Sequence, residues 1–280
     1  MQNIQITDCP RDAIQGLHHL ISTESKARYI QAALDSGLFH SVDFGSFVSH
    51  KAVPQMADTA EVLKLLKKTD FGTKLLAIIA NERGAHEAAE CELVDILGFP
   101  FSASEVFQNR NTGAGREEAL GRIKSILKIG EDKGKSVRIY ISMAFGNPYQ
   151  ELWNSELVEV WVKRLFELGV QEIALSDTVG IALEQDISNL FFSLTNRMSE
   201  ITFSGHFHAR PGEWRSKVKA AYEAGCTHFD GAMQGFGGCP MADDELVGNI
   251  PTEGLLALRG VSPDKIDNLT KAFQKLIANG

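Results

Sequence analysis

Short apolar runs rich in β-branched and aromatic residues alternate with longer amphipathic segments along almost the whole chain. Eight of these runs have strand character, and they are Ile4–Thr7, Ser41–Phe44, Lys74–Ile79, Leu93–Leu97, Val137–Met143, Glu172–Leu175, Ile201–Phe207 and Thr227–Ala232. The segments between them have helical periodicity, as in Glu24–Ser36, Thr59–Lys68, Glu117–Lys133, Ser155–Leu168, Leu183–Arg197 and Glu213–Ala224. Glycines such as Gly37, Gly169 and Gly225 follow several of these segments, where a helix commonly ends.

Eight β/α units in a chain of 280 residues predict an α/β fold, a single-domain (β/α)8 TIM barrel over residues 1–280. We expect the residues after about position 250 to form the final loop and helix of that barrel. A doubly wound open sheet is the alternative, but no glycine-rich phosphate motif follows the first strand.

The composition narrows the classes of partner. The net charge is -8 and no basic stripe is present, so we expect no nucleic acid partner. No run approaches the roughly 18 apolar residues of a membrane span, and the N-terminus shows no secretory leader, so we expect neither a membrane nor export. The four cysteines form no CxxC pair or disulfide framework, which favours a reducing cytoplasm.

The segment His206-Phe207-His208 ends the seventh predicted strand. Side chains alternate across a strand, so both imidazoles project to the same side and can bind one metal ion. Carboxylates lie at the ends of other predicted strands, at Asp12, Asp43 and Asp177. Active sites of such barrels lie at the carboxyl ends of the strands, so these side chains should converge on one mouth.

Each of these residues also has a structural interpretation. Asp12 or Asp177 would serve as a helix N-cap, and Asp43 as a turn residue. Arg11 would be the partner in a structural ion pair. Cys239 would be a small packed side chain, and Asn249 a loop residue bonded to its own backbone. The predicted convergence at one mouth favours the functional interpretation of the set.

Six motifs make the chain similar to a known family. They are Arg11-Asp12-x-x-Gln15, Ser46-Phe47-Val48-Ser49-x-Lys51, Val53-Pro54-Gln55-Met56, Asp177-Thr178-x-Gly180, His206-x-His208 and Gly235-x-Gly237-Gly238-Cys239-Pro240. Together they resemble the hydroxymethylglutaryl-CoA lyases, which belong to the metal-dependent lyase and condensing-enzyme barrels. The resemblance extends from about Ile4 to Asn249.

This resemblance implies cleavage of 3-hydroxy-3-methylglutaryl-CoA to acetyl-CoA and acetoacetate, with a divalent cation as cofactor. The implied cation ligands are Asp12, His206, His208 and Asn249. Mixed oxygen and imidazole ligands suit Mg²⁺ or Mn²⁺. We assign Gln15, Asp43, Ser142 and Thr178 to substrate binding.

The implied chemistry also gives catalytic roles. Arg11 would stabilise the oxyanion of the thioester enolate, and either His206 or Asp177 would accept the hydroxyl proton. Cys239, on a glycine-rich loop, would act as an acid or as part of a lid. The resemblance further implies a homodimer.

The chain departs from the family pattern near these residues. Asp43 stands where the family usually has glutamate, and Phe44 where it usually has threonine. Ala209 and Arg210 follow the His-x-His motif, where the family usually has an aspartate that would be a plausible partner for a histidine ligand. Two alternatives therefore remain: a lyase or Claisen condensing enzyme for another 3-hydroxyacyl-CoA, or a non-catalytic barrel that binds metal or ligand.

Overall fold

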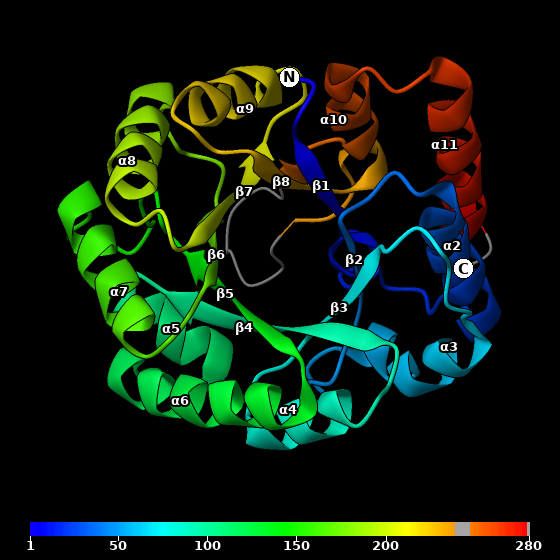
Figure 1. The fold of residues 1–280 in the computed structure, drawn as a ribbon, viewed down its shortest axis with the longest axis horizontal. Coiled ribbons are helices and arrows are strands. Elements are labelled where there is room, and N and C mark those ends of the chain that lie inside the picture. Colours follow the sequence, from blue (N-terminus) through cyan, green and yellow to red (C-terminus); the bar gives the residue numbers. More distant parts are fainter. Residues whose placement is uncertain (239–246, 279–280) are drawn as a thin grey trace.

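The computed structural model describes residues 1–238 and 247–278. Within these residues, eight parallel strands close into a barrel because β6 pairs with β7 as well as with β5. The strands are β1 (Gln5–Asp8), β2 (Ser41–Ser46), β3 (Lys74–Ile78), β4 (Val94–Ser102), β5 (Ser136–Ser142), β6 (Glu172–Asp177), β7 (Thr202–Ala209) and β8 (His228–Gly231). Figure 1 shows this barrel ringed by helices. The predicted single-domain (β/α)8 barrel is confirmed.

The helices that follow the strands form the outer layer. The main ones are α2 (Thr23–Ser36), α3 (Thr59–Leu65), α4 (Glu82–Ala89), α6 (Arg116–Lys133), α7 (Ser155–Glu167), α8 (Glu184–Arg197) and α9 (Trp214–Glu223). Shorter elements lie in the loops at the carboxyl ends of the strands, namely α1 (Pro10–Ile14), η1 (Pro54–Met56), α5 (Glu105–Thr112) and η2 (Met233–Gly235). Local chemistry sets the helix ends: Ser22 accepts the Ser25 amide before α2, and Gly37 ends that helix with a φ of 61°.

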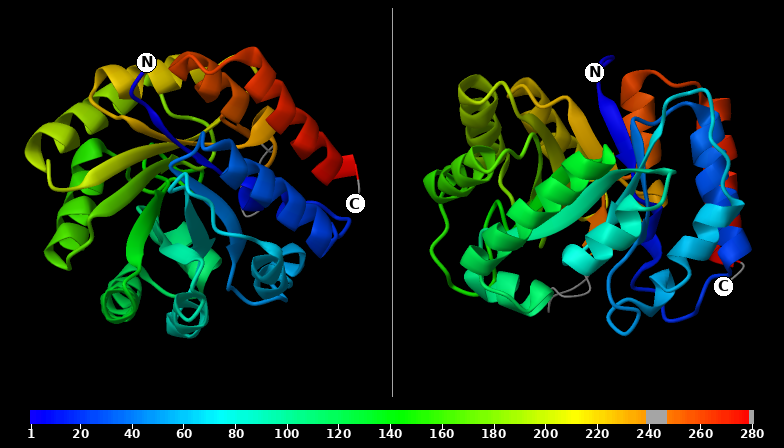
Figure 2. Two further views of the ribbon diagram at one scale, coloured as in Figure 1. Left: turned by 45° about the vertical axis from the view of Figure 1, so that its right-hand side comes forward. Right: turned by 60° about the horizontal axis from the view of Figure 1, so that its bottom comes forward.

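The end of the chain differs from the expected loop and single helix. A two-residue strand, β9 (Gly248–Asn249), pairs antiparallel with β7, and two helices follow it, α10 (Thr252–Arg259) and α11 (Pro263–Ala278). The break arises at Gly260, which ends α10 with a φ of 87°, and at Pro263, which begins the next helix. Figure 2 shows α11 lying beside α2 at the outside of the barrel.

The apolar core has two parts. The larger lies between strands and helices and includes Leu75 and Ala77 of β3. The side chains on the other face of the strands form a separate cluster, with Leu76, Ile96 and Tyr140. Because side chains alternate along a strand, this second cluster fills the barrel interior. No helix among the described residues is both long and apolar enough to cross a membrane.

Candidate metal centre and active site

Asp12, His206 and His208 meet at the carboxyl ends of β1 and β7. One potential ligand atom from each lies within 4.8 Å of the others, and all three residues are buried. The two histidines project to the same side because they alternate with Phe207 on β7, which packs in the outer core. Asp12 reaches the same point from α1, directly after β1. The predicted convergence of these three side chains is therefore present.

Each imidazole is held through its Nδ1 atom. His206 Nδ1 lies 3.1 Å from a carboxylate oxygen of Asp230, and His208 Nδ1 lies 3.0 Å from the carbonyl oxygen of Thr178. The Nε2 atom of His208 is buried and has no hydrogen-bond partner among the described residues. An orphaned buried nitrogen beside a carboxylate is what a cation ligand set requires, so the side chains present fit a divalent cation.

Asn249 of β9 lies beside this group. It pairs with His208 across the antiparallel β7–β9 ladder, and its side-chain amide donates to Asp12 Oδ2 at 2.7 Å and to the Phe236 carbonyl at 2.9 Å. A Cβ atom on Gly237, whose φ is 92°, would lie 2.6 Å from the Asp12 carbonyl oxygen. A glycine is therefore required where this loop passes over the site.

Arg11 forms a fork with a carboxylate beneath the cavity. Its Nε lies 3.2 Å from both oxygens of Asp43, and its Nη2 lies 2.5 Å from Oδ2. Its Nη1 donates to Gln15 at 2.8 Å and to Asp12 at 3.2 Å. Burial favours the neutral form, but Asp43 and Asp12 outweigh it and raise the pKa of Arg11, which stays cationic. A fixed positive charge thus lies beside the candidate cation site.

A cavity of about 460 Å³ opens above these residues. Its lining includes Arg11, Asp12, Gln15, Ser142, Thr178, His206 and His208. Burial opposes ionisation of Asp12, yet the charges of Arg11 and the histidines, with the Asn249 amide, lower the pKa of its carboxyl group. An ionised carboxylate and two imidazoles thus face a cavity large enough for a small acyl group and part of a longer arm.

The comparisons with known proteins agree with this geometry. The model of the HMGL-like family matches residues 3–271. The chain belongs to this family. A hydroxymethylglutaryl-CoA lyase of Pseudomonas mevalonii is 33% identical over 92% of this chain and 85% of that protein. The mitochondrial hydroxymethylglutaryl-CoA lyase of Bos taurus is 33% identical over 95% of this chain and 81% of that protein.

Solved structures of HMG-CoA lyases have the same fold as this HMGL-like protein. The Pseudomonas aeruginosa enzyme superposes with a TM-score of 0.90 at 27% identity, over 100% of this chain and 94% of that one. The Acinetobacter baumannii enzyme, in complex with coenzyme A and 3-methylmalate, gives 0.89 at 26% identity, over 99% and 92%. Membership of the HMGL-like family, which is metal-dependent, makes the chain a carbon–carbon lyase. Its residues Asp12, His206 and His208 form a group that could hold a metal ion.

Three predicted site residues of this HMGL-like chain, Asp43, Asp177 and Asn249, are not among the residues that line the cavity. Asp43 is fully buried behind Arg11, so its carboxylate orients the guanidinium. Asp177 accepts the amides of Ile181 and Ala182 and an ion pair from Lys217 at 2.6 Å. Burial raises the pKa of Asp177 despite these partners. These contacts fix the loop before α8, whose N-cap is Leu183, so Asp177 is neither a helix cap nor a base open to substrate.

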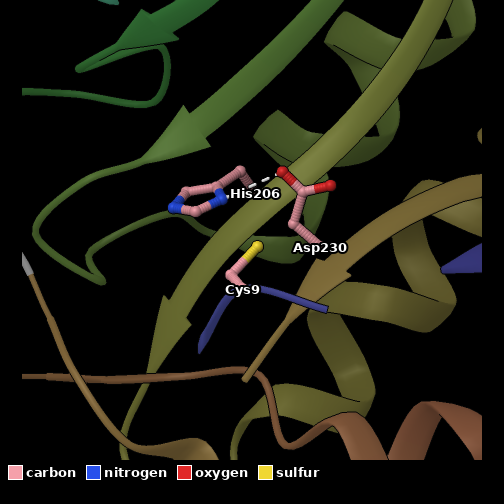
Figure 3. A group of neighbouring side chains, drawn as sticks. All are labelled: Cys9, His206 and Asp230. Atoms are coloured by element: carbon pink, nitrogen blue, oxygen red, sulfur yellow. Dashed lines mark hydrogen bonds and ion pairs between the residues drawn. The ribbon is translucent and has the colours of Figure 1, made fainter. Parts of the chain in front are cut away.

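The sequence patterns missed the residues that support the site from inside the barrel. Asp230 on β8 holds His206, and Figure 3 shows its carboxylate bonded to the imidazole with the Cys9 sulfur facing both. Burial raises the pKa of the Cys9 thiol well above its usual value, so the sulfur packs there as a neutral group. The signal for Asp230 was its position at the end of a predicted strand, the same signal that selected Asp43. The predicted Cys239 lies outside the described residues.

Proposed function

We propose that this protein cleaves 3-hydroxy-3-methylglutaryl-CoA to acetyl-CoA and acetoacetate with Mg²⁺ or Mn²⁺ as cofactor. The observation that carries the proposal is the group Asp12–His206–His208 beside the cationic Arg11 at the cavity floor. Asn249 is the proposed fourth ligand on the strength of the family motif; its Nδ2 donates to Asp12, and a cation would take its Oδ1. The bound cation would supply Lewis-acid polarisation of the substrate's oxygen atoms.

The protein's own side chains give the remaining steps. A base takes the proton of the tertiary hydroxyl, the bond between C2 and C3 breaks, and the electron pair passes to the thioester as an enolate. The product carbonyl of acetoacetate forms from the former hydroxyl carbon. Of the two proposed bases, His206 lines the cavity, whereas Asp177 is engaged by Lys217. His206 is thus the one that reaches the cavity, but its Nε2 lone pair is assigned to the proposed cation and its Nδ1 to Asp230, so it can take the proton only while it is not a cation ligand.

Arg11 is placed to stabilise the enolate oxygen. Its Nη1 group lies on the cavity side of the Asp43 fork, where it can donate to an incoming oxyanion in place of Gln15. Gln15, Ser142 and Thr178 are the proposed polar contacts to the acyl group, since all three line the cavity.

Protonation of the enolate carbon completes acetyl-CoA. Cys239 is the proposed acid or lid residue on the strength of the family motif. We expect Cys239→Ser to retain cation binding and to slow turnover. Full activity of this variant would reduce the residue to a packing role.

The lining of the cavity offers polar groups to a coenzyme A thioester. The lining continues outward to Asn111 on α5 and Arg122 on α6, where the polar arm and phosphates of coenzyme A would find donors. The related enzyme of Acinetobacter baumannii binds coenzyme A. We therefore propose an acyl-CoA as the substrate class.

A homodimer in the cytoplasm is proposed as the working form. Val160 on α7 and Phe192 on α8 expose large apolar side chains, which a second barrel would cover. Cys9, Cys91 and Cys226 are free thiols, as a reducing compartment would keep them. Light scattering of the purified protein tests the dimer.

The proposed reaction is tested with metal-stripped protein, by following acetoacetate release from 3-hydroxy-3-methylglutaryl-CoA with and without Mg²⁺ or Mn²⁺. We expect cleavage only with the cation. His208→Ala should abolish it, and His40→Ala, at the opposite end of the barrel, should not. Cation binding by the wild type without cleavage would refute the proposed substrate.

A further inference from the structure

A line of buried charged side chains runs across the barrel interior beneath His206. Asp230 of β8 places Oδ2 at 3.1 Å from His206 Nδ1 and Oδ1 at 2.7 Å from an Nη atom of Arg138 on β5. Arg138 and Asp230 are both almost fully buried, with side-chain exposures of 6% and 1%. Each oxygen of this carboxylate therefore has its own partner, one on each side (Figure 3 shows the His206 side).

Arg138 is itself fixed by neighbouring strands. It donates to Ser204 Oγ on β7 at 2.5 Å and to Thr7 Oγ1 on β1 at 3.1 Å. Thr7 also shares a hydrogen bond with Ser41. A buried ion pair whose remaining donors are satisfied is stable only in one geometry, so Asp230 cannot rotate away from His206 without leaving charge unpaired.

The two imidazoles of the site differ in what holds them. His208 Nδ1 faces a neutral carbonyl, that of Thr178, whereas His206 Nδ1 faces a carboxylate. An ionised carboxylate accepts hydrogen bonds and cannot donate them, so the Nδ1 atom of His206 must carry the hydrogen. Its lone pair is then left on Nε2, and the negative charge makes that nitrogen a stronger donor to a cation.

We propose that Asp230, anchored by Arg138, is the positioning residue that fixes the His206 tautomer and directs Nε2 to the cation. This inference rests on the proposed cation site. The carboxylate partner of His206 comes from a residue 24 positions later, on the adjoining strand.

The first test compares Mn²⁺ binding by calorimetry in wild type, Asp230→Asn and Cys9→Ala. Asparagine has nearly the same shape but can turn its amide toward Nδ1 and select the wrong tautomer. We expect the Mn²⁺ dissociation constant of Asp230→Asn to rise about 10- to 100-fold. Cys9→Ala removes a neutral group that faces His206 and Asp230, and it should change the Mn²⁺ dissociation constant less than about twofold.

A folded Asp230→Asn protein that binds Mn²⁺ as tightly as wild type overturns the inference. If Asp230→Asn does not fold, the tautomer of His206 in the wild type tests the inference instead. In metal-free protein, at a pH high enough that the His206 nitrogen-15 shifts no longer change with pH, nitrogen-15 NMR distinguishes the two tautomers of the neutral ring. The His206 signals are those lost in His206→Gln.

We expect hydrogen on Nδ1 of His206, and hydrogen on Nε2 would refute the proposal. The tautomer measurement needs no cation and no turnover. Wild type that binds no Mn²⁺ would refute the proposed function while the spectrum still tests Asp230.

Discussion

Asp8 ends β1 and is fully buried between two outer helices. Its carboxylate accepts hydrogen bonds from the Tyr29 hydroxyl of α2 at 2.6 Å and the Thr252 hydroxyl of α10 at 2.7 Å. Burial dominates these contacts and raises the pKa of Asp8 from 3.8 to about 6. The ionised form is therefore less stable inside the protein than in the unfolded chain, and Asp8→Asn should remove that pH-dependent cost.

The sign and size follow from linkage. The folded state holds the proton more tightly, so the contribution of Asp8 to stability is fully present below pH 3.8 and is lost as pH rises through about 6. At 1.36 kcal/mol for each pKa unit, ionisation costs about 3 kcal/mol at pH 7.5 and about 1.5 kcal/mol at pH 5. The free energy of unfolding of Asp8→Asn, relative to wild type, should therefore rise by about 1.5 kcal/mol between these two pH values.

Urea unfolding of both proteins at pH 5 and pH 7.5 measures this change, with the midpoint and slope fitted at each pH. Taking the difference in unfolding free energy between the two proteins cancels the contribution of every other titrating group. A constant loss from the new amide, whose NH₂ needs a partner, shifts both differences equally and leaves their change intact. Asp267→Asn, at an exposed carboxylate of α11, is the control for loss of one charge. A difference that stays constant or falls with pH would refute the reasoning.

Three further changes test the site and its support. Arg11→Lys removes the fork on Asp43 and should lower kcat about 100- to 1,000-fold with the fold intact, so a rate within a few fold of wild type would contradict the assigned role. Gly237→Ala places a methyl group against the Asp12 backbone and should weaken Mn²⁺ binding, as measured by calorimetry. An unchanged affinity would show that the backbone around Gly237 can move to accept the methyl group. Lys217→Met leaves the Asp177 charge buried and unpaired, at a cost of about 3–5 kcal/mol that should lower the thermal midpoint, and an unchanged midpoint would mean that Asp177 is neutral in the fold.

The barrel could be predicted because its signal repeats. Each β/α unit carries the same change from period two to period 3.6, so an error in one unit does not change the fold. Boundaries were harder. The fourth strand was expected to end at Leu97, yet β4 continues through Gly98 and Pro100 to Ser102 and pairs with β5 along that whole stretch. Glycine and proline ordinarily weaken a strand, and here barrel closure prevails over local preference.

Some residues of the candidate site could be predicted from local sequence and others could not. His206 and His208 were identifiable because their relationship is local, two positions apart on one strand. Asp230 and Arg138 meet across 92 positions through barrel register, which no single stretch of sequence encodes. Asp177 was correctly placed at a strand end, but alternation and spacing do not tell which way a carboxylate turns after the strand finishes.

The contact between Asn249 and Asp12 has a consequence for how the molecule assembles. These side chains are 237 positions apart, so the four proposed ligands come together only after β8 has joined β1 and β9 has paired with β7. Contacts over so large a sequence separation carry a loop-closure cost and slow the folding of a chain. A cation at 100 times its dissociation constant would stabilise the closed ring by about 2.7 kcal/mol and give nothing to partly formed chains. The bound cofactor would thus stabilise the closed barrel by linking β1 and α1 to β7 and β9.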